Sequence, residues 1–187
     1  MNIKFKVQNI NRIKRNISMG KTISVENFKL PLYNEIPDVG LYLDQVTKYI
    51  AKYIEPLECI SITSSMISNY VKKKIITNPI KKQYYREQIA ELFFIVLAKS
   101  VISLEDVSTM LHIYRSKYKT EQAYKYFAEV MSESLCIDKD QQIVSTECSH
   151  RDMDNETAFE QGLLRNVVMA VAYKVYLEKT FQSLRKN

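Results

Sequence analysis

The sequence predicts a mainly α-helical protein with little or no β structure beyond one short hairpin. Apolar residues recur at spacings of three and four along most of the chain, which is the period of amphipathic helices. Only three glycines and four prolines occur among the 187 residues, whereas an all-β protein needs many turns built from these two residue types. With 46% hydrophobic and 26% charged residues, the chain has the composition of a folded globule that can bury a sizeable core.

The chain begins with a basic stretch, residues 1–30, which we interpret as an N-terminal arm because it shows no sustained period. Pro31 and Pro37 bracket an extended segment that leads into the fold. The first helix is predicted over residues 41–55, where apolar side chains recur at helical spacing until Pro56 stops it.

A second helix is predicted over residues 64–74, with Thr63 as its N-cap. The segment 75–84 contains an Asn-Pro turn signal and has room for a small two-stranded hairpin or for a bent loop. A third helix is predicted over residues 86–100 from the spacing of its apolar residues.

The next helix is predicted over residues 104–113, because Ser103 is a suitable N-cap and two acids follow in the first turn, where the helix dipole favours them. A fifth helix is predicted over residues 120–135. Residues 138–154 are polar and lack a period, so we interpret them as a long loop.

The last helix is predicted over residues 156–184, with Asn155 as its cap, and its middle is apolar on nearly every face. A helix that is apolar all round is buried on all sides. Either it is the central helix of a bundle, or its second face closes a homodimer. Residues 114–187 therefore form a helical extension that supports the core and is expected to make the dimer.

The net charge of +6 is distributed unevenly along the chain. Residues 61–86 contain six bases and no acid. A solvated surface usually mixes both signs, so this stretch is either the end of a soluble helix or an electrostatic footprint for phosphates.

The predicted helix over residues 64–74 has two chemically different sides. At 100° per residue, Ile67, Tyr70 and Val71 share one apolar side. The opposite side carries hydroxyls, one amide and an ammonium group, which can hydrogen-bond base edges in the major groove of duplex DNA. The candidate base-contacting residues are Ser65, Ser68, Asn69 and Lys72.

A second set of residues is suited to the phosphate backbone that flanks such a helix. Two roles are equally open for Tyr70: contact with a phosphate, or packing between the helix and the hairpin. The candidate phosphate contacts are Tyr70, Lys73, Lys81, Lys82, Tyr84 and Arg86.

The order of these features resembles the MerR-type winged helix-turn-helix. A capped helix ends in Tyr70 and lysines, a paired aliphatic and a Pro79-containing wing follow, and a Ser-Leu-Glu-acid-aliphatic helix start lies at 103–107. The segments Pro37 to Val46 and Met66 to Lys72 are similar to an uncharacterised bacterial family that is described only as a domain of unknown function. The resemblance implies a DNA-binding winged helix-turn-helix over residues 31–113 and control of transcription.

The sequence departs from the MerR pattern at two places. MerR-type proteins often have glycine after the recognition helix, and here that position is Lys74. A lysine costs about 1 kcal/mol there if the backbone φ is positive. The link from the 41–55 helix to Thr63 is also longer than the usual turn of three or four residues.

Several other classes of function find no support in the sequence. The cysteines are widely spaced and odd in number, which favours a reducing, cytoplasmic location. No apolar run approaches the length of a membrane span, and no catalytic constellation, metal ligand set or cofactor motif is present. We therefore expect a sequence-specific binder of double-stranded DNA, not an enzyme, and a homodimer that reads two half-sites. The alternative is a protein-interaction module that uses the basic face and the last helix.

Overall fold

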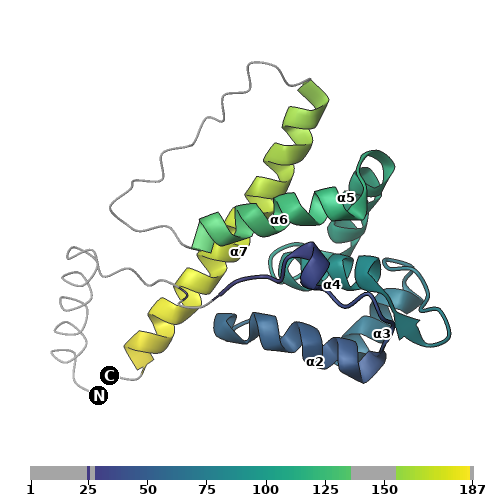
Figure 1. Ribbon diagram of the computed structural model, residues 1–187. Coiled ribbons are helices and arrows are strands. Elements are labelled where there is room, and N and C mark those ends of the chain that lie inside the picture. Colours follow the sequence, from purple (N-terminus) through teal and green to yellow (C-terminus); the bar gives the residue numbers. More distant parts are fainter. Residues whose placement is uncertain (1–24, 26–27, 136–154, 186–187) are drawn as a thin grey trace, which may run out of the picture.

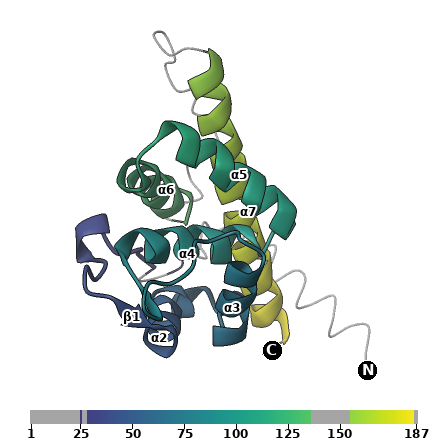
Figure 2. The same ribbon diagram turned by 90° about the vertical axis from the view of Figure 1, so that its right-hand side faces the viewer.

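The computed structural model describes residue 25, residues 28–135 and residues 155–185. Over this part of the chain the protein is mainly helical, as predicted, and the β structure is a two-stranded antiparallel sheet (Figures 1 and 2). The helices are α2 (Leu43–Ile54), α3 (Ser64–Lys72), α4 (Arg86–Ala98), α5 (Leu104–Lys117), α6 (Thr120–Leu135) and α7 (Asn155–Arg185). The strands are β1 (Leu41–Tyr42) and β2 (Gln83–Tyr84), and two 3₁₀ turns are η1 (Tyr33–Glu35) and η2 (Glu55–Leu57).

The predicted helices are all found, but some of their ends differ. The first begins two residues late, because Leu41 and Tyr42 pair with β2 as a strand. The α5 helix continues past the predicted end at residue 113 to Lys117, so the predicted boundary between the two parts of the chain falls inside a helix.

The hydrophobic core includes residues that precede the predicted arm boundary at residue 30. The side chains of Val25, Phe28 and Leu30 are buried in the hydrophobic core. The remaining predicted features of the arm and the predicted loop over 138–154 lie outside the described residues.

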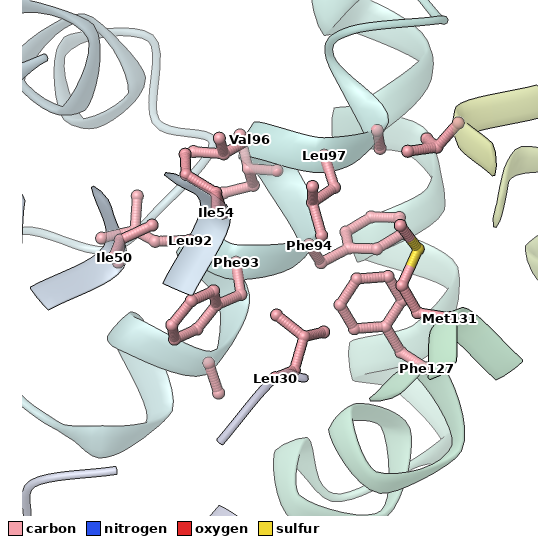
Figure 3. Packing of buried hydrophobic residues seen from close by; sticks show 14 of the residues in the cluster. Leu30, Ile50, Ile54, Leu92, Phe93, Phe94, Val96, Leu97, Phe127 and Met131 are labelled. Atoms are coloured by element: carbon pink, nitrogen blue, oxygen red, sulfur yellow. The ribbon is translucent and has the colours of Figure 1, made fainter. Parts of the chain in front are cut away.

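The central helix of the fold is α4, which is buried on nearly all sides. Phe93 contacts the rings of Tyr49 and Tyr53 from α2, with centroid separations of 6.1 and 5.8 Å. On another side of α4, Phe94 meets Phe127 from α6 at 5.4 Å, edge to face. Figure 3 shows Phe93, Phe94 and Phe127 among the buried side chains of this region. The α4 helix therefore joins the α2–α3 half of the fold to the α6–α7 half.

The last helix, α7, is buried on one side and open on the other. Val168, Val171 and Val175 pack inward, whereas Tyr173 and Leu177 are exposed. Of the two alternatives for this helix, the central place in the bundle is therefore wrong, because α4 takes it. The alternative that its second face closes a dimer stays a prediction. Within the described residues, neither α7 nor any other helix combines the length and the apolar character needed to cross a bilayer.

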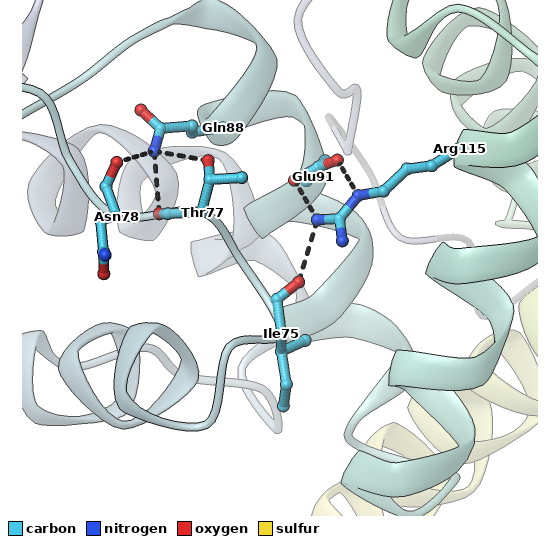
Figure 4. Close-up of polar contacts among 6 residues, drawn as sticks. All are labelled: Ile75, Thr77, Asn78, Gln88, Glu91 and Arg115. Atoms are coloured by element: carbon cyan, nitrogen blue, oxygen red, sulfur yellow. Dashed lines mark hydrogen bonds and ion pairs between the residues drawn. The ribbon is translucent and has the colours of Figure 1, made fainter.

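Two ion pairs connect α5 to its surroundings. Arg115 forms a bidentate pair with Glu91 of α4, at 2.6 and 2.7 Å, and donates a third hydrogen bond of 2.9 Å to the carbonyl of Ile75 (Figure 4). Lys117 pairs at 2.6 Å with the buried carboxylate of Glu160 on α7. The end of α5 is thus fixed to α4, to α7 and to the segment that follows α3.

Substitution Arg115→Ala is expected to lower the free energy of unfolding by about 2 kcal/mol, because it leaves the mostly buried Glu91 carboxylate and a backbone carbonyl without their donor. The matched control is Lys125→Ala, which removes an exposed pair with Glu121 within α6 and should cost less than about 0.5 kcal/mol. Urea unfolding measures both values. Equal losses for the two variants would contradict the role given to Arg115.

Candidate functional site

The α3 helix presents the polar face that the sequence predicts. Thr63 caps the helix, since its hydroxyl accepts a hydrogen bond of 3.2 Å from the backbone N–H of Met66. Ile67 and Tyr70 are buried beneath the helix. The side chains on the opposite face are exposed and have no hydrogen-bond or ion-pair partner among the described residues; they are Ser65, Ser68, Asn69 and Lys72.

The helix ends in a Schellman motif built on Lys74. The N–H of Ile75 donates to the carbonyl of Tyr70 at 3.0 Å, and the N–H of Lys74 donates to that of Val71 at 2.9 Å. This geometry places Lys74 in the left-handed region, with φ of 58°. The lysine therefore occupies a position where glycine is the more stable residue, and its side chain is exposed beside Lys73.

The segment after α3 is a hairpin, not a bent loop. Ile80 and Gln83 exchange two backbone hydrogen bonds of 3.0 and 2.9 Å. The two residues between them, Lys81 and Lys82, have positive φ angles of 50° and 66°, as in a type I′ turn. Asn and Gly are the favoured residues in such a turn, and here both places carry exposed lysines.

A buried glutamine attaches the base of the hairpin to α4 (Figure 4). The Gln88 amide nitrogen donates to the carbonyl and hydroxyl of Thr77, at 3.0 and 3.1 Å, and lies 3.3 Å from the carbonyl of Asn78. Its oxygen accepts from the N–H of Tyr85 at 3.1 Å. Sequence reasoning did not identify Gln88, although Gln at the third position of a helix is a capping signal.

Two of the predicted phosphate contacts lie in the core. Tyr70 and Tyr84 are 3% and 4% exposed, and burial raises the pKa of both phenols. For Tyr70 the packing alternative is therefore the correct one. For Tyr84 the reason is its pairing with Leu41, which places its ring on the inner side of the sheet.

Arg86 is directed toward the protein itself. Its Nε donates to the carbonyl of Ile36 at 2.8 Å, and its guanidinium lies 5.7 Å from the centre of the Tyr33 ring and 3.8 Å from the Asp38 carboxylate. These interactions do not favour the predicted role of Arg86 in contacting a phosphate. They hold the segment over residues 33–38 against the start of α4.

The long link between α2 and α3 is folded against the core. Leu57, Ile60 and Ile62 are buried along it. At its end, the Ser64 hydroxyl donates to the Asp44 carboxylate at 3.0 Å and lies 3.1 Å from the Thr47 hydroxyl. The start of α3 is therefore attached to the first turns of α2.

The α3 helix and the hairpin lie at the same end of the molecule, on the right in Figure 1, with α7 toward the other side. We call the exposed residues of this end the basic face; they are Ser65, Ser68, Asn69, Lys72, Lys73, Lys74, Lys81 and Lys82. No acidic residue occurs in the stretch 61–86 that supplies them. In the part of the chain that the structure describes, no group of His, Cys, Asp and Glu residues is arranged to hold a metal ion.

Comparison with known proteins identifies a family for the part of the chain that contains the basic face. No curated protein and no solved structure matches the chain. A family match covers residues 31–127, which reach from the lead-in segment, through α2 to α5 and the hairpin, into α6. The chain belongs to the family described as the domain of unknown function DUF1836.

Proposed function

We propose that this protein binds double-stranded DNA with sequence specificity through the basic face and regulates transcription. The observation that carries the proposal is the chemistry of that face. An amide, hydroxyls and ammonium groups stand on one exposed side of a short helix, without acids and without partners among the described residues. The arrangement of α2, α3, hairpin and α4 supports a MerR-like winged helix-turn-helix as the geometry of binding.

In this proposal α3 enters the major groove. Asn69 is suited to adenine, since its amide can donate to N7 and accept from N6 at once. Ser68 directly precedes Asn69, Ser65 lies one turn toward the start of the helix, and Lys72 lies one turn beyond. The lysines Lys73 and Lys74 follow where the helix ends, which suits contact with phosphates at the edge of the groove.

The hairpin contributes two cations at a strained turn. A lysine in the left-handed region costs stability that Asn or Gly would not cost. Lys81 and Lys82 both have this conformation, and so does Lys74. Positive charge at places where stability favours other residues supports a role for these side chains in binding a polyanion.

Replacing the turn, with Lys81→Asn and Lys82→Gly together, is expected to raise stability and weaken DNA binding. The free energy of unfolding should rise by about 1 kcal/mol, because the new pair fits the type I′ turn. If the intact face makes four to six phosphate contacts, the slope of log affinity against log salt should be about −4 to −5, and it should become shallower by about 2 units. Urea unfolding and fluorescence anisotropy at several salt concentrations measure the two effects.

A matched control for the lost charge is the pair Lys99→Asn and Lys119→Asn, which are exposed in connections away from the hairpin. This variant should leave the salt slope unchanged. If both double variants lose the same affinity, net charge and not the hairpin governs binding. If no duplex binds the wild-type protein at low salt, the proposal fails and an acidic protein becomes the expected partner of the basic face.

Substitution Asn69→Ala is expected to reduce discrimination between the selected site and random duplex by about 1–3 kcal/mol. Binding to random duplex should change little, because the amide reads a base and not the backbone. The site is first obtained by selection of bound fragments from a random pool, and the two affinities are then measured by anisotropy. Asn34→Ala, an exposed asparagine in η1, is the control and should alter neither affinity. Equal weakening on all sequences would exclude base reading by Asn69.

A further inference from the structure

The open side of α7 carries a row of apolar residues. Phe159, Tyr173, Leu177 and Phe181 are between 46% and 66% exposed. At 100° per residue they fall within one arc of about 100°, together with three smaller residues. We call this set the α7 stripe; it comprises Phe159, Gly162, Asn166, Ala170, Tyr173, Leu177 and Phe181, and the half-buried Leu163 and Thr180 lie in the same arc.

The α7 stripe contains no charged residue over more than six helical turns. An exposed helix face in water ordinarily carries charges of both signs. Gly162 has open space on this side, since a Cβ added there would meet no atom within 4 Å. A long uncharged row of this kind, apolar except for the amide of Asn166, is typical of a surface that another molecule covers.

The order of large and small residues along the stripe identifies the partner. Phe159 and Phe181 both lie eleven positions from Ala170, one on each side. If a second α7 runs antiparallel with Ala170 at the midpoint, Phe159 of each chain lies beside Phe181 of the other. The small Gly162 then lies one residue, about 1.5 Å along the axis, from the level of the large Leu177 of the partner, and Asn166 lies equally close to the level of Tyr173.

We propose that the α7 stripe binds the α7 stripe of a second copy of this chain, antiparallel, with the twofold axis near Ala170. Such an interface is isologous, because each half supplies what the other half needs. The small residue at the axis allows the helix backbones to approach closely, and the rings at the ends fill the remaining space. A parallel pair would place Gly162 against Gly162 and leave a gap. The contact would run for about 33 Å, at 1.5 Å per residue.

This inference goes beyond the proposed DNA binding and does not depend on it. The α7 stripe is separate from the basic face, and the assembly can be measured without any nucleic acid. Failure of one proposal therefore leaves the other standing.

The first experiment measures mass in solution by sedimentation equilibrium of the full chain. The wild-type protein should have twice the chain mass of 21.9 kDa. Ala170→Arg places two like charges at the axis and should raise the dimer dissociation constant by about 100-fold or more. Gln182→Arg adds the same charge on the opposite side of α7 and should leave the dimer intact. Circular dichroism shows that each variant is folded.

The second experiment tests the antiparallel order by disulfide cross-linking, with linked peptides identified by mass spectrometry. Ala170→Cys should cross-link to itself, and a mixture of Phe159→Cys and Phe181→Cys proteins should yield the mixed disulfide. A parallel pair would instead link each of these two variants to itself. A monomeric wild-type protein, a dimer unaffected by Ala170→Arg, or self-linking of Phe159→Cys would each overturn the proposal.

Discussion

Burial of α4 on nearly all sides is the constraint on which the rest of the fold depends. Its aromatic pair, Phe93 and Phe94, contacts α2 through one ring and α6 through the other. The same helix attaches the hairpin through Gln88 and the end of α5 through Glu91. Because these contacts come from one rigid element, the basic face is held by the interior of the molecule and not by its own short segments, which are too small to be stable alone.

Hydrogen bonds from buried or partly buried side chains support the basic face. Three of its lysines nevertheless have backbone angles that are not the most stable ones for this residue. Gln88 and Arg115 both donate to backbone carbonyls in the first half of the segment that joins α3 to β2, those of Thr77 and Ile75. Lys74, Lys81 and Lys82 have the positive φ angles that glycine adopts at little cost. Rigid support beneath strained, exposed cations is the physical pattern expected of a surface adapted to bind, since packing stability alone favours other residues.

Much of the helical framework could be predicted from the sequence, because apolar spacing and caps such as Thr63 and Ser103 are local signals. The exposure of Asn69 and Lys72 followed from the same periodicity. Burial of Tyr84 could not be predicted, since it depends on pairing with Leu41, which lies far away in the chain. The contacts of Arg86 and Arg115 are likewise between distant segments, and no local pattern indicates them. The place of α7 stayed open between the centre of the bundle and a dimer contact, because its apolar composition does not say which face meets the core.

The buried side chains of Val25, Phe28 and Leu30 show that the part of the chain that folds together is longer than the part that matches the family. The family match starts at residue 31 and stops at residue 127, yet the interior also contains these three residues, Val130 and Met131 of α6, and the inner side of α7. A fragment cut to the limits of the match would lose a large share of its apolar interior and expose the rest to water. Any shortened version made for crystallisation or labelling therefore has to begin before Val25 and keep the last helix.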